Sequence, residues 1–130
     1  MAAAVNKLIR IAMAVAKEGE GVGRNDNYRL GALLFDKRHR VLSCRPNSYR
    51  THPKALYFGR YPYLHAEAHA VFSHGMDNCK YHNLLVVRVD SKGRLTMAKP
   101  CASCTELIKH VGIKDVFYSD WNSGIQKLQA

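Results

Sequence analysis

The chain has 130 residues, of which 47% are hydrophobic and 23% charged, a composition typical of one soluble globular domain over residues 1–130 and unlike that of a disordered chain. Twenty Lys and Arg against ten Asp and Glu give a formal net charge of +10, which favours nucleic acid or phosphorylated small molecules as partners, although a basic surface can also serve solubility alone. Every apolar stretch is shorter than the roughly 18 residues of a membrane span, so we expect no membrane partner and a cytoplasmic protein.

The first half of the chain predicts one helix and two strands. Apolar residues recur at helical spacing over residues 5–18, with polar residues between them, which predicts an amphipathic helix. The nearly continuous apolar run Arg29–Phe35 predicts a strand buried on both faces. Residues 36–40 predict a turn and 41–44 a second strand. The following segment contains several prolines, which predicts a long loop.

The second half predicts two helices and three or four strands. We expect helices over residues 63–74 and from Pro100 to about residue 111, where proline suits the first helical turn. We expect strands at Asn83–Val89 and 113–118, and residues 94–97 follow a turn at 91–93. Residues 125–128 can return as an antiparallel strand, with no room for a helix before them. This order predicts an α/β fold with a mixed sheet of about five strands and helices over its faces.

Two short motifs contain the residues that can bind a metal ion and transfer protons. Cys101 and Cys104 are three residues apart, so at the start of a helix both thiols project from one face, where the helix N-terminus favours the thiolates that bind zinc. His65 begins a different predicted helix and can supply a third ligand, which leaves a fourth position open, as in catalytic zinc sites. Glu67 leaves that helix in another direction and can move protons beside the metal.

A second interpretation of these residues is a closed structural zinc site. Structural sites have four protein ligands, so a fourth would have to come from His69, Cys79 or Cys44. His69 is one helical turn from His65 and is the best candidate. This interpretation gives Glu67 no role, whereas an open site does. The absence of a secretory signal favours metal binding by the Cys pair over disulfides.

The His-x-Glu and Pro-Cys-x-x-Cys motifs resemble those of the cytidine/deoxycytidylate deaminase superfamily. The resemblance implies a three-layer α-β-α fold and hydrolytic deamination of a cytosine nucleoside or nucleotide, with release of ammonia, as part of pyrimidine metabolism. It also implies Zn²⁺ held by His65, Cys101 and Cys104, Glu67 as the catalytic proton shuttle, and a homo-oligomer. The short C-terminal hairpin is similar to that of the small cytidine and blasticidin deaminases, which act on free substrates.

The resemblance also points to residues that contact the substrate. Asn47 matches the family's asparagine that contacts the sugar, and we expect Ala66 to line the same site. Tyr49 stands where cytidine deaminases have a ribose-binding Glu, and His69 stands where deoxycytidylate deaminases have Asn. Residues 50–63 mix cations with aromatic rings, so Arg60 is a candidate for binding a substrate phosphate, unless this loop packs against another subunit. Deamination of single-stranded DNA or RNA, and a non-catalytic zinc module that binds nucleic acid, stay open as alternatives.

Overall fold

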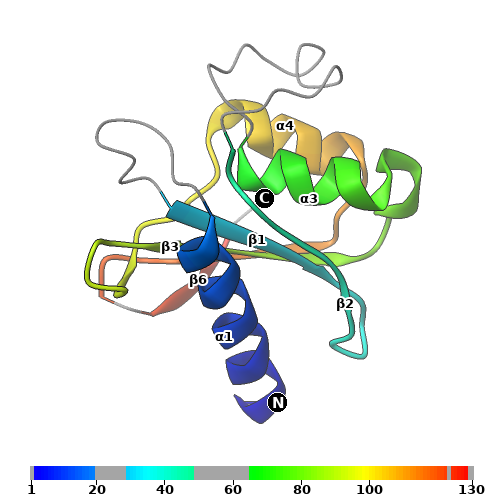
Figure 1. Ribbon diagram of the computed structural model, residues 1–130. Coiled ribbons are helices and arrows are strands. Elements are labelled where there is room, and N and C mark those ends of the chain that lie inside the picture. The colour runs from blue at the N-terminus through cyan, green and yellow to red at the C-terminus, as the bar shows by residue number, and fades with distance from the viewer. Residues whose placement is uncertain (1, 20–28, 49–64, 123, 129–130) are drawn as a thin grey trace.

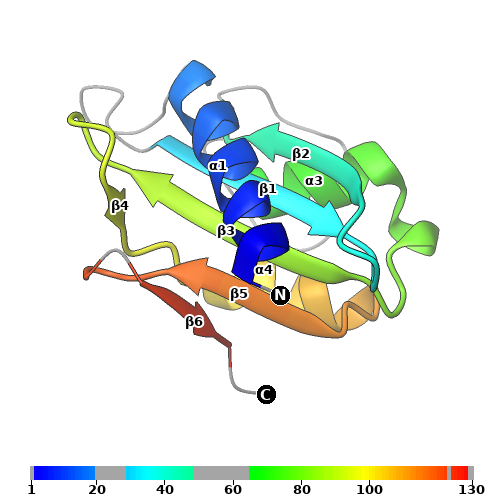
Figure 2. The same cartoon turned by 90° about the horizontal axis from the view of Figure 1, so that it is seen from below.

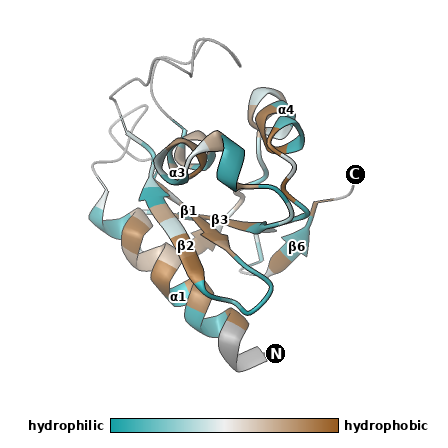
Figure 3. Cartoon of the chain, turned by 90° about the vertical axis from the view of Figure 1, so that its right-hand side faces the viewer, coloured by the Kyte–Doolittle hydropathy of each residue, from teal (hydrophilic) through white to brown (hydrophobic). Residues whose placement is uncertain are grey.

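A computed structural model of the chain describes residues 2–19, 29–48, 65–122 and 124–128. A central sheet lies between α1 on one face and α3 and α4 on the other, so the predicted three-layer α-β-α architecture is confirmed (Figure 1). Figure 3 shows the same layers from the side. The elements in chain order are α1 (Ala2–Glu18), β1 (Arg29–Phe35), β2 (Val41–Pro46), α3 (Ala66–His74), the 3-10 turn η2 (Met76–Asn78), β3 (Asn83–Val89), β4 (Leu95–Thr96), α4 (Ala102–His110), β5 (Asp115–Ser119) and β6 (Ile125–Lys127).

The sheet is mixed, with strand order β2-β1-β3-β5-β6, and the short β4 pairs with the end of β3 (Figure 2). Only β3 and β5 run parallel to each other, and they are connected through β4 and α4. The remaining pairs are antiparallel, including the C-terminal hairpin of β5 and β6. The predicted mixed sheet and its antiparallel terminal hairpin are therefore confirmed.

Two apolar cores lie on opposite faces of the sheet. Because successive side chains of a strand point to opposite faces, Leu33 and Phe35 of β1 pack with α1, whereas Ala32 and Leu34 pack with α3 and α4. β1 is accordingly buried on both faces, as its sequence predicts. Gly31 lets α1 approach closely, since a Cβ atom there would lie 2.3 Å from the backbone oxygen of Ala12. No helix of the described residues is long and apolar enough to cross a membrane.

Some boundaries differ from those predicted. The helix expected over residues 63–74 begins only at Ala66, because His65 has extended backbone angles (φ −69°, ψ 149°) and is the N-cap. β2 continues to Pro46, two residues beyond the predicted strand. Pro46 lies opposite Gly31 of the neighbouring strand β1. After the predicted turn at 91–93, two residues form the short strand β4.

Three turns that connect antiparallel strands are built in the same way, around Asp36, Asp90 and Asp120. In each turn one carboxylate oxygen accepts hydrogen bonds from the backbone N–H groups two and four residues further on. The second oxygen of Asp36 and of Asp90 binds the Nε of an arginine, Arg40 at 2.7 Å and Arg94 at 3.0 Å. These turns join β1 to β2, β3 to β4 and β5 to β6, so each antiparallel hairpin has a fixed register.

Candidate active site

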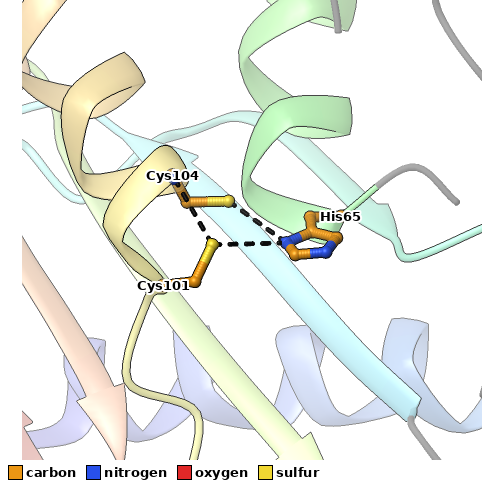
Figure 4. Close-up of side chains that lie close together, drawn as sticks. All are labelled: His65, Cys101 and Cys104. Atoms are coloured by element: carbon orange, nitrogen blue, oxygen red, sulfur yellow. Dashed lines mark hydrogen bonds between the residues drawn. The ribbon is translucent and has the colours of Figure 1, made fainter. Parts of the chain in front are cut away.

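The three predicted metal ligands converge where α3 and α4 begin, above the same face of the sheet (Figure 4). His65 and Cys101 are the N-cap residues of these two helices, and Cys104 lies in the first turn of α4. The Nδ1 atom of His65 lies 3.7 Å from the Sγ of Cys101 and 3.3 Å from the Sγ of Cys104. Residues 36 positions apart in the sequence thus form one cluster.

This cluster fits a tetrahedral zinc ion. Zinc–nitrogen and zinc–sulfur bonds of about 2.0–2.1 and 2.3 Å, at tetrahedral angles, separate the nitrogen from each sulfur by about 3.6 Å. The observed separations of 3.3 and 3.7 Å lie on either side of that distance. Two sulfurs and one imidazole nitrogen are also the donor set that zinc prefers. Of the described residues, these three form a candidate metal site.

The electrostatics at the two helix starts favour a metal-binding thiolate. The hydrogen bond from Cys104, and next that from His65, lower the pKa of Cys101 to about 3, although burial acts in the opposite direction. The backbone N–H of Cys104 also points at this sulfur, at 3.5 Å. For His65, burial acts to lower the pKa, but the hydrogen bond with Cys101 and the charges of Glu67 and Cys101 outweigh it and raise the pKa. Together, His65 and Cys101 therefore keep the Cys101 sulfur as the thiolate that binds a metal ion.

Glu67 lies two residues after His65 and is only 3% exposed. Burial raises the pKa of its carboxyl group above the usual range, against the opposing effects of its own backbone N–H and the charge of His65. The Oε1 atom has no hydrogen-bond partner within the described residues. Burying a carboxylate oxygen without a partner costs free energy of folding. A bound group that donates a hydrogen bond to Oε1 would remove this cost.

The alternative fourth ligands lie elsewhere. His69 faces β2, where its Nδ1 is 2.8 Å from the carbonyl oxygen of Pro46 and donates to it, so this ring fixes the end of β2. The Cys79 thiol is buried and donates to the carbonyl oxygen of Gly75, and burial raises its pKa to about 11. Burial likewise raises the pKa of Cys44, on β2, to about 11. None of the three belongs to the metal cluster, so the described residues do not form a closed four-ligand site.

A cavity of about 200 Å³ opens beside the cluster. Asn47, Ala66 and Glu67 line it, together with the metal ligands His65 and Cys101. Asn47 is 2% exposed, and its Oδ1 accepts a hydrogen bond from the Leu30 N–H at 3.1 Å, which fixes the amide on the cavity wall. The volume is below the roughly 300–1,000 Å³ of drug-sized sites and suits a small heterocycle. The predicted substrate residues Asn47 and Ala66 thus share a cavity with Glu67.

Five further residues of this wall were not singled out from the sequence. They are Leu30, Arg88, Met97, Ala98 and Lys99. The sequence does contain a signal for Arg88. Side chains two apart in a strand point to the same face of the sheet, so Arg88 lies on the face of Leu84 and Val86, which pack under α3 and α4. Ser119 links these segments: its hydroxyl accepts from the Arg88 N–H at 3.1 Å and donates to the carbonyl oxygen of Thr96 at 2.6 Å.

Arg60 and the basic aromatic segment 50–63 lie outside the described residues, as does Tyr49. Their predicted contacts with a substrate or with another subunit stay predictions.

The fold and the zinc-type cluster agree with a comparison against known families. A model of the cytidine and deoxycytidylate deaminase zinc-binding region matches residues 3–120, which include all of the elements from β1 to β5. The chain therefore belongs to this deaminase family, and zinc is its metal. No curated protein matches the chain.

Proposed function

We propose that this protein is a single-domain hydrolytic deaminase, over residues 1–130, that converts a cytosine nucleoside or nucleotide to its uracil product and ammonia. The observation that supports this most directly is the position of Glu67, a buried carboxylate that shares one small cavity with the His65, Cys101 and Cys104 cluster. A structural zinc site has no use for such a carboxylate, whereas a hydrolytic site needs a group that carries protons.

When bound, zinc supplies Lewis acidity that activates water for attack on C4 of the base. In our proposal the Oε1 atom of Glu67 accepts a proton from the attacking water. The carboxyl group delivers this proton to N3 of the ring. It then accepts the second proton from the hydroxyl group added at C4 and delivers it to the leaving amine, so that both protons of the water are used, the C4 carbonyl forms and ammonia departs. The raised pKa of Glu67 suits this exchange, because burial makes its carboxylate a stronger base towards water than an exposed carboxylate is.

Asn47 and Ala66, which line the same cavity, are proposed to position the substrate. Asn47 is held by Leu30 through a second bond as well, since its own N–H donates to the Leu30 carbonyl oxygen at 3.3 Å. The neighbouring His69–Pro46 hydrogen bond further fixes this stretch against α3. An amide so constrained can orient a sugar hydroxyl with little loss of entropy on binding.

Two cations on the cavity wall, Arg88 and Lys99, favour a substrate that has a phosphate group. The test is an assay of the zinc-loaded protein with cytidine, deoxycytidine, dCMP and dCTP, read as uracil product. We expect Lys99→Gln to raise KM for dCMP about tenfold more than KM for deoxycytidine, because one charge-assisted hydrogen bond is lost. Lys92→Gln, at an exposed cation outside the cavity, is the matched control. No turnover of any of these compounds by a zinc-loaded, folded protein would contradict the proposal.

The net charge of +10 favours a second candidate, deamination of cytosine in single-stranded DNA or RNA. Cytosine-containing oligonucleotides in the same assay separate the two candidates, because only a polynucleotide deaminase turns them over faster than dCMP.

We further propose that the enzyme acts in pyrimidine metabolism in the cytoplasm as a homo-oligomer. Light scattering coupled to size-exclusion chromatography tests the oligomer, and a monomer at micromolar concentration would contradict it.

A further inference from the structure

A second cavity, of about 470 Å³, opens at the far end of the sheet from the deaminase cavity. The residues that line it belong to the β1–β2 turn and to the segment that enters β3. Figure 2 shows both segments at the end of the sheet opposite to β4. Leu30 of β1 lines the first cavity and Asp36 the second, so about 20 Å of extended strand separates the two. Seven residues line the second cavity: Asp36, Lys37, Arg38, Arg40, Lys80, Tyr81 and His82.

Most of the charged side chains around this cavity are cations, and most of these cations form no ion pair with a carboxylate of the described residues. Asp36 is its only carboxylate, and that group is held inside its own turn by Arg40, 2.7 Å away. In the part of the chain that the structure describes, no carboxylate forms an ion pair with Lys37, Arg38 or Lys80. All three side chains are exposed, so they present three positive charges to one hollow in the surface.

Tyr81 adds an aromatic ring at the rim. Its side chain is 70% exposed, and its φ of 69° is a backbone conformation that a bulky residue rarely adopts. The backbone is fixed in this conformation, because the Tyr81 N–H donates to the Gly112 carbonyl oxygen at 2.8 Å and the next carbonyl oxygen, of His82, accepts from the Lys114 N–H at 2.8 Å. A large ring is thus held in solvent on a backbone with little freedom.

Lys80 is held beside that ring. Its Nζ lies 5.0 Å from the centre of the Tyr81 ring, within the range of a cation–π contact. Its aliphatic part packs against Gly112, where a Cβ atom would come within 3.1 Å of the Lys80 Cγ. Gly112 has φ 80°, so both its backbone and its missing side chain allow Lys80 to lie close.

A cluster of cations next to an exposed, fixed aromatic ring has the chemistry that recognises nucleotides: the cations bind phosphate and the ring stacks on a base. The volume is within the range of small-ligand sites, roughly 300–1,000 Å³. We propose that this cavity is a second binding site, separate from the deaminase cavity, for a phosphate-bearing nucleotide, either free or within a single strand. Lys37, Arg38 and Lys80 bind the phosphate, and Tyr81 stacks on the base.

The first test measures binding to the cations without any need for turnover. Fluorescence anisotropy of the full zinc-loaded chain uses a labelled thymidine oligonucleotide, which has no cytosine to be deaminated. The triple variant Lys37→Gln, Arg38→Gln, Lys80→Gln is compared with a control that loses the same charge at exposed cations elsewhere. The control is Lys7→Gln, Arg10→Gln, Lys109→Gln.

We expect the cavity variant to bind at least tenfold more weakly at low salt, and the slope of log K against log salt to fall by about 2, as three phosphate contacts are lost. Equal weakening in both variants would mean that net charge alone binds the strand, and it would overturn the proposal. So would an unchanged affinity in the cavity variant, or no binding of any probe by the wild type.

Competition separates the two sources of nucleotide. Displacement of the oligonucleotide by thymidine monophosphate at similar concentration identifies a free nucleotide as the ligand, whereas displacement only by longer strands identifies a segment of nucleic acid. Inorganic phosphate is the third competitor and reports the phosphate subsite alone.

The second test concerns the ring. Tyr81→Ala should weaken binding roughly 5- to 100-fold, the range for loss of one stacking side chain, and Tyr81→Phe should retain most of the affinity. Trp121→Ala is the matched control, because Trp121 is equally exposed, at 68%, and lies outside this cavity. Similar losses for Tyr81→Ala and Trp121→Ala, or none for Tyr81→Ala, would overturn the role of the ring.

Discussion

Glu67 is buried in the first turn of α3, next to small side chains. Alanines alternate with other residues here, and Ala66, Ala68 and Ala70 are almost completely buried. These small side chains let the start of α3 approach the sheet, so the carboxylate between them is enclosed as well. Among the described residues its Oε1 has no hydrogen-bond partner, and burying such an oxygen costs stability. Buried carboxylates of this kind cluster at functional sites.

The first prediction is that Glu67→Gln loses about 10²–10⁴-fold in turnover number, the typical contribution of general acid–base catalysis. The amide has the same shape but cannot relay protons, so the fold and zinc content should be unchanged. Product formation measures the first, and circular dichroism and metal analysis measure the second. Glu106→Gln, at an exposed carboxylate of α4, is the control. A Glu67→Gln enzyme with wild-type turnover would show that this carboxylate has only a structural role.

The second prediction concerns the sulfur ligands. Cys101→Ala or Cys104→Ala should remove stoichiometric zinc, because only one imidazole and one thiolate remain to hold it. Cys79→Ala and Cys44→Ala should keep about one zinc per chain, since both sulfurs lie outside the cluster. Elemental analysis of the purified variants measures this. Full zinc content in both ligand variants would refute the assignment.

At the scale of the elements, the repeated aspartate turn explains how the hairpins keep their register. In two of the turns the third residue after the aspartate has a left-handed backbone: His39 has φ 62° and Gly93 has φ 77°. The His39 ring stacks on Phe35, with ring centres 5.8 Å apart, so a contact with β1 accompanies this less favourable conformation. In each of these two turns, one carboxylate and one left-handed residue thus reverse the direction of the chain.

The third prediction is a pH dependence of stability that arises from Asp36. The hydrogen bond from the Arg40 backbone, and further bonds from Arg40 and Arg38, lower the pKa of Asp36 from 3.8 to about 2. Because the folded-state pKa is depressed, the unfolded chain binds the proton more tightly, and the carboxylate stabilises the fold at every pH above about 4. This contribution is lost as the pH falls from about 4 to about 2.

Asp36→Asn should therefore lower the free energy of unfolding at pH 7, and the difference from wild type should shrink below pH 4. Urea unfolding between pH 7 and pH 2.5 measures this difference. Asp77→Asn, at an exposed carboxylate in η2 outside these turns, is the control for the loss of one negative charge. A constant difference between Asp36→Asn and wild type across this range would contradict the role of the charge.

At the scale of the whole molecule, the sequence is sufficient for the layers and the metal cluster. Continuous apolar runs identify β1 and β3, and helical periodicity identifies α1. The two sulfurs could be predicted to lie together because both are at one helix start, three residues apart. His65 is 36 positions away from Cys101 and could be placed with them because the His-x-Glu and Pro-Cys-x-x-Cys motifs resemble those of one family. The hairpin of β5 and β6 follows from the short distance between them along the chain.

Features that depend on distant segments could not be predicted. The cavity wall combines β1, β3 and the segment before α4, and nothing local in the sequence brings Arg88 and Lys99 beside Glu67. The same holds for the second cavity, where the register Phe35↔Asn83 places the β1–β2 turn next to Lys80 and Tyr81. The predicted start of α3 is wrong because His65 itself has extended backbone angles and is the N-cap, a backbone property that residue periodicity does not report.

The geometry of the metal cluster has a consequence for thermal stability. His65 and Cys101 begin different helices and are 36 positions apart, so an ion between them closes a long loop and acts as a cross-link. A ligand that binds only the folded chain stabilises it by about 2.7 kcal/mol when its concentration is one hundred times its dissociation constant.

The fourth prediction is therefore that chelation lowers the melting temperature by about 10 °C and that added zinc restores it. Differential scanning calorimetry measures the shift, and Cys104→Ala should melt at the same temperature with or without chelator. Zinc availability would then set how long each folded molecule survives as well as whether it can react.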